Sequence, residues 1–182
     1  MIKLINKITG QKAFMIVEMI VAVALITFSI IGPLSAAKSS LVAAADIRNH
    51  VESVYLADEA VEYIRMVRDN NIFEGRGWLD SLGDCFLASG CGISVTENNV
   101  SKCLSGTGDC ELKFNQSTGL FTYRNGSGWL PTGIKRKVRL TETAADREAE
   151  IVVTIERRRL DYPTRTYTMR AILMNWKQQI TP

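Results

Sequence analysis

The chain has 182 residues, of which 23% are charged, and its formal net charge is +3. This length suits one ordinary domain with an appendage and argues against two full domains. Basic residues are spread along the chain, so the composition argues against nucleic acid as a partner. The run Arg157, Arg158, Arg159 is the exception, and we interpret it as the charged, exposed end of a strand.

Apolar residues are concentrated near the N-terminus. Residues 19–37 contain no charged side chain, and as a helix rising about 1.5 Å per residue they would span roughly 28 Å. The hydrocarbon core of a bilayer is about 30 Å thick, so this segment has the length of a membrane span. Gly32 and Pro33 lie inside it, and we expect a kink or a loosened turn there.

Lysines precede this segment at positions 3, 7 and 12, and no acidic residue comes before Glu18. By the positive-inside rule these lysines stay in the cytoplasm, so the residues after Lys38 are expected on the outer side of the membrane. The four cysteines would then lie in a compartment where disulfides persist.

Three interpretations of the apolar segment compete. It could be a removable secretory signal that ends at the small residues Ser35, Ala36 and Ala37, or it could be a plain single-span anchor. Neither explains Glu18, because an ionised carboxylate in hydrocarbon costs about 3 kcal/mol on insertion scales and needs a partner. The third interpretation is a segment that acquires a partner for this carboxylate.

The sequence KAFMIVEMI, which begins at Lys12, closely resembles the processing site of type IV prepilins and type II secretion pseudopilins. In that family a dedicated peptidase removes a short basic leader just before a residue that is usually Phe, and glutamate is the fifth residue of the mature chain. The resemblance implies a leader of residues 1–13, cleavage between Ala13 and Phe14, N-methylation of Phe14, and a role for Glu18 in subunit assembly.

The residue before the cut is normally glycine in this family, and here it is Ala13. Cleavage after Gly10 is the alternative, but it would leave Lys12 in the mature chain and make Glu18 its eighth residue. We therefore favour cleavage between Ala13 and Phe14. If Ala13 slows the peptidase, the protein would be processed poorly or remain an uncut membrane anchor.

Cleavage would create an α-amino group that is cationic at neutral pH, because the ordinary pKa of this group is about 7.8. Glu18 would accept this amine, either within the chain or from the subunit already placed in a filament. A buried ion pair is a weak net stabiliser, but removing one member leaves an uncompensated charge that costs about 3–5 kcal/mol. The pair is therefore suited to fixing axial register.

Helical periodicity continues beyond Lys38 to about Asn70. A helix from Phe14 to Asn70 would be about 85 Å long, which is typical of a membrane span, a coiled coil or a filament stalk. Residues 55–71 also resemble the second half of the long helix of minor pilins and pseudopilins. Apolar residues recur at spacings of three and four, and this apolar stripe consists of Leu41, Ala44, Ile47, Val51, Val54, Ala57, Val61 and Ile64.

The cysteines Cys85, Cys91, Cys103 and Cys110 lie in a glycine-punctuated, loop-rich stretch. Their spacing lacks the paired short knuckles of structural zinc sites, so two disulfides are favoured over a metal or free thiols. Four cysteines allow three pairings, and we choose nearest neighbours, Cys85 with Cys91 and Cys103 with Cys110. These bonds would staple a region too rich in Gly, Ser and Asn to be held by burial alone.

The last third of the chain shows the β-branched and aromatic residues of strands, with partial alternation. An antiparallel sheet packed against the outer half of the helix would bury the apolar stripe, which gives an α+β fold of the pilin type. The predicted strands are residues 111–115, 120–124, 137–141, 149–157 and 166–172, with turns at 143–148 and 160–164. The expected organisation is a leader (1–13), a membrane-spanning or filament-core helix (14–37), an amphipathic helix continuing into the head (38–71) and a disulfide-containing head (72–182).

Side chains suited to catalysis are sparse. His50 is the only histidine, so a His-based triad or metal cage would depend on it alone. Asp80 and Asp84 could act as an acid/base pair, but loops collect acidic residues in any case. We therefore expect no enzymatic activity, cofactor or metal. The three tryptophans could form a binding surface, although filling the small core is the favoured interpretation; they are Trp78, Trp129 and Trp176.

These features favour a minor pilin or pseudopilin, a non-enzymatic structural subunit of a type IV pilus or a type II secretion-like filament. Its expected partners are other pilin or pseudopilin subunits, the prepilin peptidase, an inner-membrane assembly platform, and the lipid bilayer before assembly. The expected location is the bacterial inner membrane, single-pass with the head outside the cytoplasm, and then an extracytoplasmic filament. The alternative is a single-span, membrane-anchored binding or adhesin module that does not polymerise.

Overall fold

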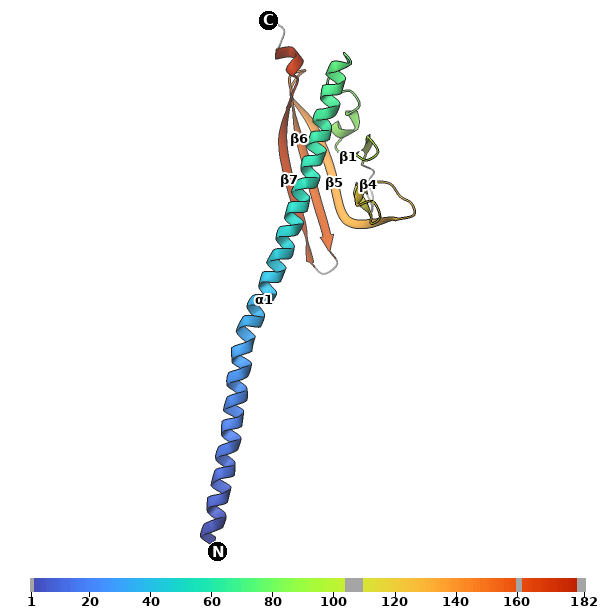
Figure 1. The fold of residues 1–182 in the computed structure, drawn as a ribbon. Coiled ribbons are helices and arrows are strands. Elements are labelled where there is room, and N and C mark those ends of the chain that lie inside the picture. The colour runs from blue at the N-terminus through green and yellow to red at the C-terminus, as the bar shows by residue number, and fades with distance from the viewer. Residues whose placement is uncertain (1, 104–109, 160–161, 180–182) are drawn as a thin grey trace. The chain divides into compact units, whose positions relative to one another are not determined.

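In the computed structural model, a long N-terminal helix is followed by an antiparallel sheet, which is an α+β architecture (Figure 1). The structure describes the backbone of residues 2–103, 110–159 and 162–179, and the side chains of residues 14–103, 110–158 and 164–177. Two compact units are present, Met1–Asn49 and His50–Pro182. The division falls inside the helix, so the second unit contains the last part of the helix and the whole sheet.

Helix α1 (Ile2–Phe73) is longer than predicted at both ends. At its N-terminus it includes residues expected to form the leader, and at its C-terminus it continues to Phe73. The chain stays α-helical through Gly32 and Pro33, so the loosened turn expected there is not seen. Pro33 lacks an N–H group, which costs the helix one hydrogen bond to the carbonyl of Ser29. Long helical stretches on both sides keep this turn in the helical conformation.

The sheet of the second unit is organised around one long strand, β5, which pairs with β6 along one edge and with β1 and β3 along the other. β2 extends the sheet beyond β1, β4 beyond β3, and β7 beyond β6, all antiparallel. The strands are β1 (Cys91–Ser94), β2 (Asn99–Lys102), β3 (Glu111–Asn115), β4 (Leu120–Thr122), β5 (Trp129–Ala144), β6 (Glu148–Arg159) and β7 (Tyr162–Met174), with short 3-10 helices η1 (Gly83–Phe86) and η2 (Trp176–Gln179).

Every predicted strand is present, and β3 has the predicted bounds. β5 begins at Trp129, eight residues before the predicted start at residue 137. The prediction missed its first part because Pro131 and Gly133 interrupt the sequence pattern of a strand. Gly133 has a φ of +69°, and a Cβ there would lie 2.7 Å from the carbonyl oxygen of Arg158. The facing strand β3 shifts register at this level, so the sheet contains a bulge. β7 begins inside the turn predicted at 160–164, part of which lies outside the described residues.

The stretch expected to be loop-rich was predicted wrongly in one part, since β1 and β2 form a hairpin there. β1 is buried at all four positions and β2 is largely exposed, so neither strand shows the alternation of a half-buried strand. β1 reaches the main sheet through a single pair, Cys91 with Val138. The hairpin therefore attaches the cysteine-containing stretch to the sheet.

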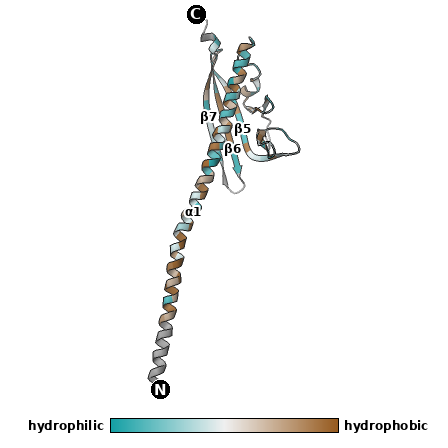
Figure 2. Ribbon diagram, viewed as in Figure 1, coloured by the Kyte–Doolittle hydropathy of each residue, from teal (hydrophilic) through white to brown (hydrophobic). Residues whose placement is uncertain are grey.

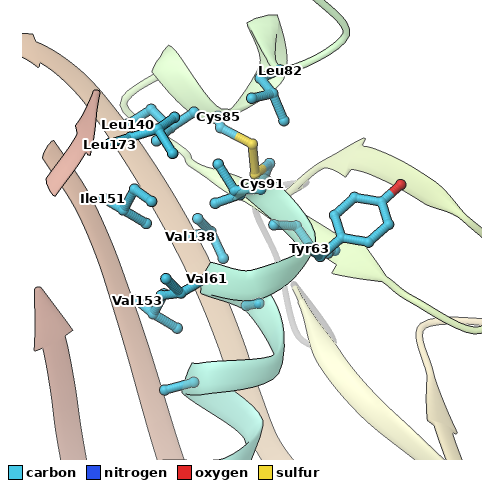
Figure 3. Close-up of a cluster of buried hydrophobic side chains, with 14 of the residues drawn as sticks. Val61, Tyr63, Leu82, Cys85, Cys91, Val138, Leu140, Ile151, Val153 and Leu173 are labelled. Carbon is cyan, nitrogen blue, oxygen red and sulfur yellow. A yellow bond between two sulfur atoms is a disulfide. The ribbon is translucent and has the colours of Figure 1, made fainter. Parts of the chain in front are cut away.

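The core of the second unit lies between α1 and one face of the sheet (Figure 3). The small residues Ala57 and Ala60 are fully buried, so the helix backbone approaches the strands closely. The predicted stripe is buried at Ala57, Val61 and Ile64, whereas Leu41 and Ile47 in the first unit are exposed. The strands contribute alternate residues, which are Ile134, Val138 and Leu140 on β5, Ile151, Val153 and Ile155 on β6, and Leu173 on β7.

Candidate functional site

One helix in the described part of the chain is long and apolar enough to cross a membrane, and its apolar stretch lies near the N-terminus (Figure 2). Burying one large apolar side chain is worth about 1.5–3 kcal/mol, so such a surface needs an apolar environment. These features are those of a single-pass membrane anchor. The exposed large side chains are Phe14, Met15, Ile16, Val17, Met19, Ile20, Val21, Val23, Leu25, Ile26, Phe28, Ile30, Ile31 and Leu34.

Two hydroxyl groups of this segment, those of Thr27 and Ser29, are satisfied within the helix. The hydroxyl of Thr27 donates to the carbonyl of Ala24 at 2.8 Å, and the hydroxyl of Ser29 donates to the carbonyl of Ile26 at 2.8 Å. Such bonds remove the cost of placing a hydroxyl in hydrocarbon. Glu18 differs, because it forms no ion pair or hydrogen bond with any described residue and its side chain is exposed among apolar neighbours.

The predicted processing residues lie in the first turns of the described side chains. Phe14 is helical and 75% exposed, and Glu18 follows one turn later on the same helix. The side chain of Ala13 lies outside the described residues, although its backbone is helical. The structure therefore presents Phe14 and Glu18 as neighbours one helical turn apart, with no internal partner for the carboxylate among the described residues.

Both disulfides are present, in the pairing chosen from the sequence, and no cysteine is free. Cys85–Cys91 joins η1 to β1, and both of its residues are fully buried in the core. Cys103–Cys110 closes the chain between β2 and β3, with a Cα–Cα distance of 5.4 Å. Because disulfides persist in oxidising compartments, they indicate that the head is extracytoplasmic.

A buried arginine in the head was missed by the sequence analysis. Arg136 on β5 is 1% exposed, and its guanidinium donates to the carbonyl of Leu56 on α1 at 2.9 Å and to the carbonyl of Ile93 on β1. It also forms an ion pair with Glu59 at 3.1 Å and donates from Nε to the hydroxyl of Tyr123 at 3.1 Å. Arg136 therefore links the helix, the hairpin and the central strand through one charge.

Burial alone would lower the pKa of Arg136, but Tyr123 and Glu59 raise it, and the net pKa is above its ordinary value. The guanidinium is therefore a permanent cation inside the core. Its position has the same parity as Ile134, Val138 and Leu140, so the alternation along β5 already placed it on the buried face.

The side chains considered for catalysis lie on different elements of the fold. The ring of His50 lies 5.3 Å from that of Tyr167, and Asp80 accepts a hydrogen bond from the backbone of Gly77 at 3.1 Å. Asp84 lies in η1. Among the described residues, no three His, Cys, Asp or Glu side chains lie close enough together to hold a metal ion.

The tryptophans occupy separate places in the head. Trp78 is 6% exposed and belongs to the core. Trp176 packs against the core and donates from its indole nitrogen to Asp69 at 2.9 Å. Trp129 begins β5 and pairs with Asn115 on β3. Core filling accounts for Trp78 and Trp176.

Comparison with known protein families, with curated proteins and with solved structures finds no match to this chain.

Proposed function

We propose that this protein is a minor pilin or pseudopilin, a non-enzymatic subunit of a type IV pilus or a type II secretion-like filament. The observation that carries the proposal is Glu18, an unpartnered carboxylate on an apolar helix, one turn after Phe14. A secretory signal or a plain anchor gives this carboxylate no role. A mature chain that begins at Phe14 gives it a cationic partner, the new α-amino group.

The apolar helix supports a transfer from lipid to a bundle of helices. Before assembly the bilayer would cover the exposed side chains of residues 14–37, and in the filament other pilin or pseudopilin subunits would replace the acyl chains. Small residues such as Ala22, Ala24 and Gly32 allow close helix approach. The prepilin peptidase and an inner-membrane assembly platform are the other partners, and the inner membrane is the site of assembly.

The head supports the outward, structural part of this role. It has its own core and two disulfides, as an extracytoplasmic module needs. The head would cap or decorate the filament, and its surface would contact neighbouring subunits.

The decisive experiment maps the N-terminus of the protein recovered from cell membranes, using mass spectrometry of intact and digested chains. The expected chain begins at Phe14 and carries a methyl group on its α-nitrogen. Ala13→Gly should increase the processed fraction, because it restores the glycine that the family prefers. Gly10→Ala is the matched control, and it should leave processing unchanged.

A chain that still begins at Met1 would overturn the proposal and favour the non-polymerising membrane-anchored binding module. A chain that begins after Ala37 would instead identify the segment as a removable secretory signal. Loss of processing in Gly10→Ala would move the cut to the earlier position and remove the argument for Glu18 as the fifth residue.

A further inference from the structure

Three Asn-x-Ser sequences lie in the head: Asn99-Val100-Ser101, Asn115-Gln116-Ser117 and Asn125-Gly126-Ser127. Asn-x-Ser, with x other than proline, is the acceptor motif for N-linked glycans in exported proteins. Transfer requires an enzyme to bind the asparagine amide and the serine hydroxyl at the same time. An acceptor in a folded protein therefore needs both side chains free and a backbone that is not held in a sheet.

The motif at Asn115 fails both requirements. Its Oδ1 accepts hydrogen bonds from the backbone N–H of Ser117 at 3.0 Å, from the hydroxyl of Ser117, and from the N–H of Thr118 at 3.3 Å. The backbone of Asn115 lies between two strands, paired with Leu120 on one side and Trp129 on the other. The asparagine and serine of this motif are therefore engaged with each other.

The motif at Asn99 fails the backbone requirement. All three of its residues belong to β2 and pair with β1, Asn99 with Ser94 and Ser101 with Gly92. Asn99 and Ser101 are exposed, but the ladder holds the chain extended along its whole length. An enzyme would have to strip β2 from the sheet to bend this segment.

The motif at Asn125 meets both requirements. Residues 124–128 are all exposed and lie between β4 and β5, outside any strand. Neither Asn125 nor Ser127 uses its side chain in a hydrogen bond to a described residue. The ion pair from Arg124 to Glu97, at 3.3 Å, and the bond from the N–H of Trp129 to the carbonyl of Gly126, at 3.3 Å, anchor the two ends of the loop.

We propose that Asn125 is an N-glycosylation site and that the other two motifs stay unmodified in the folded head. The donor class is an oligosaccharide linked through pyrophosphate to a membrane lipid. Nδ2 of Asn125 attacks C1 of the first sugar, so the C1–O bond to the pyrophosphate breaks and a C1–N bond forms. The amide nitrogen loses one proton, and the lipid pyrophosphate leaves with the bonding electrons.

The glycan would be attached beside an apolar part of the head surface. Leu120 on β4, before the loop, is 44% exposed, and Leu130 on β5, after it, is 50% exposed. A glycan is bulky and strongly hydrated. Attachment at Asn125 would place this hydrated group in the loop between the two strands that carry Leu120 and Leu130.

The test is glycopeptide mapping of the full chain purified from its own cells, with fragmentation that locates the modified residue. The expected result is a glycan on Asn125 alone. Asn125→Gln and Ser127→Ala should both lower the intact mass by the whole glycan, and Ser127→Thr should retain it. Asn115→Gln and Asn99→Gln are the matched controls, and they should leave the glycan mass unchanged.

An unmodified Asn125 in the native protein would overturn the inference, as would a glycan on Asn99 or Asn115 in its place. A mass increase of about one dalton alone would show deamidation of the Asn-Gly pair and would count as unmodified. The inference requires an extracytoplasmic head and a cell that supplies the transfer enzyme and the lipid-linked donor, and it does not require filament assembly. An uncut, non-polymerising chain would still carry the glycan, so failure of the proposed function and failure of this inference are distinguishable.

Discussion

Two charged side chains, Glu18 in the first unit and Arg136 in the second, lie among apolar residues under opposite conditions. Arg136 is buried, and its own chain supplies an ion pair and three further hydrogen-bond acceptors. Glu18 is exposed on the helix, and no described residue pairs with it. The head thus satisfies its buried charge by folding, whereas the described fold gives the carboxylate on the apolar helix no partner.

The apolar side chains of the two units show the same contrast. In the head they are buried between α1 and the sheet, whereas between Phe14 and Leu34 they cover an exposed helix surface. A surface of this kind is stable only in lipid or against other apolar helices. The first unit is therefore suited to an apolar environment such as a membrane, and the second unit to water.

Removing the Glu18 carboxylate is the change with the largest expected effect. Glu18→Gln keeps the size of the side chain, and in the proposed filament subunit it would leave the α-amino group of Phe14 without its partner, which costs about 3–5 kcal/mol. Incorporation into filaments should fall by about a hundredfold or more, because each 1.4 kcal/mol is a factor of ten. The measurement is the ratio of this chain in sheared filaments to that in membranes.

Ser29→Ala is the matched control for this variant, because the hydroxyl of Ser29 bonds only to its own helix. It should incorporate normally, and both variants should insert into the membrane as well as the wild type. Normal incorporation of Glu18→Gln would contradict the proposed pairing of Glu18 with the α-amino group.

Removing the guanidinium of Arg136 should destabilise the head by about 1–3 kcal/mol, the cost of leaving a buried hydrogen-bonding group without its partner; Glu59, which also loses its partner, is 37% exposed and remains solvated. Arg136→Met fills the space but leaves the carbonyl of Ile93 buried without this donor. The free energy of unfolding can be measured on the full chain in detergent micelles, with the fluorescence of the buried Trp78 as the signal.

Arg170→Met supplies the comparison for Arg136→Met. Arg170 is exposed and pairs with Glu150 at 2.7 Å on the surface of the sheet. Its loss should cost about 1 kcal/mol or less. An equal loss of stability in the two variants would contradict the prediction that the buried Arg136 contributes more to the free energy of unfolding than a surface ion pair does.

The two disulfides should differ in how the head depends on them. Short loops of this kind contribute about 2 kcal/mol each in the chain-entropy model. Replacing both Cys85 and Cys91 with alanine also removes two fully buried sulfur atoms from the core, whereas Cys110 is only partly buried. Removing the disulfide Cys85–Cys91 should therefore lower the free energy of unfolding more than removing Cys103–Cys110. A thiol reductant should reduce Cys103–Cys110 first. Trapping the free thiols with a mass label at successive times would show the order.

Periodicity predicted the long helix and the main strands because their apolar residues repeat over many turns or strand residues. It failed where a strand shows no alternation of buried and exposed residues, as in β1 and β2, or where a proline and a glycine interrupt the pattern. Pro131 and Gly133 predict the end of a strand, but in the structure β5 continues through them with a β-bulge. These features depend on neighbouring strands, which a local pattern does not contain.

The charged residues of the candidate site also differ in how much of their role a local sequence pattern can predict. Glu18 was found because one charge stands out in an apolar run, and that signal is local. Arg136 carries a local signal too, since it shares the buried parity of Val138 and Leu140 on β5. Its partners are out of reach of a local pattern, because the carbonyls of Leu56 and Ile93 are backbone atoms brought together only by packing the helix on the sheet.

The smallest expected effect concerns a carboxylate at the far end of the same helix. A hydrogen bond from Arg68, opposed by burial and assisted by a hydrogen bond from Trp176, holds the pKa of Asp69 below its ordinary value. The folded state therefore favours the ionised form, and this contribution is complete above the unfolded pKa of about 4 and is lost as the pH falls through the lower folded pKa.

Asp69→Asn should lower the free energy of unfolding at pH 7 by about 1 kcal/mol or less, because the Asp69 side chain is 39% exposed and solvent screens the pair. The difference from wild type should stay constant down to about pH 5 and shrink below pH 4, since the wild-type carboxyl then becomes neutral as well. Asp58→Asn is the control, because Asp58 is exposed on the same helix and has no ion pair with a described residue. It should change the free energy of unfolding at pH 7 by about 0.5 kcal/mol or less. An Asp69→Asn difference that grew on acidification would mean that the hydrogen bonds from Arg68 and Trp176 do not favour the charged form.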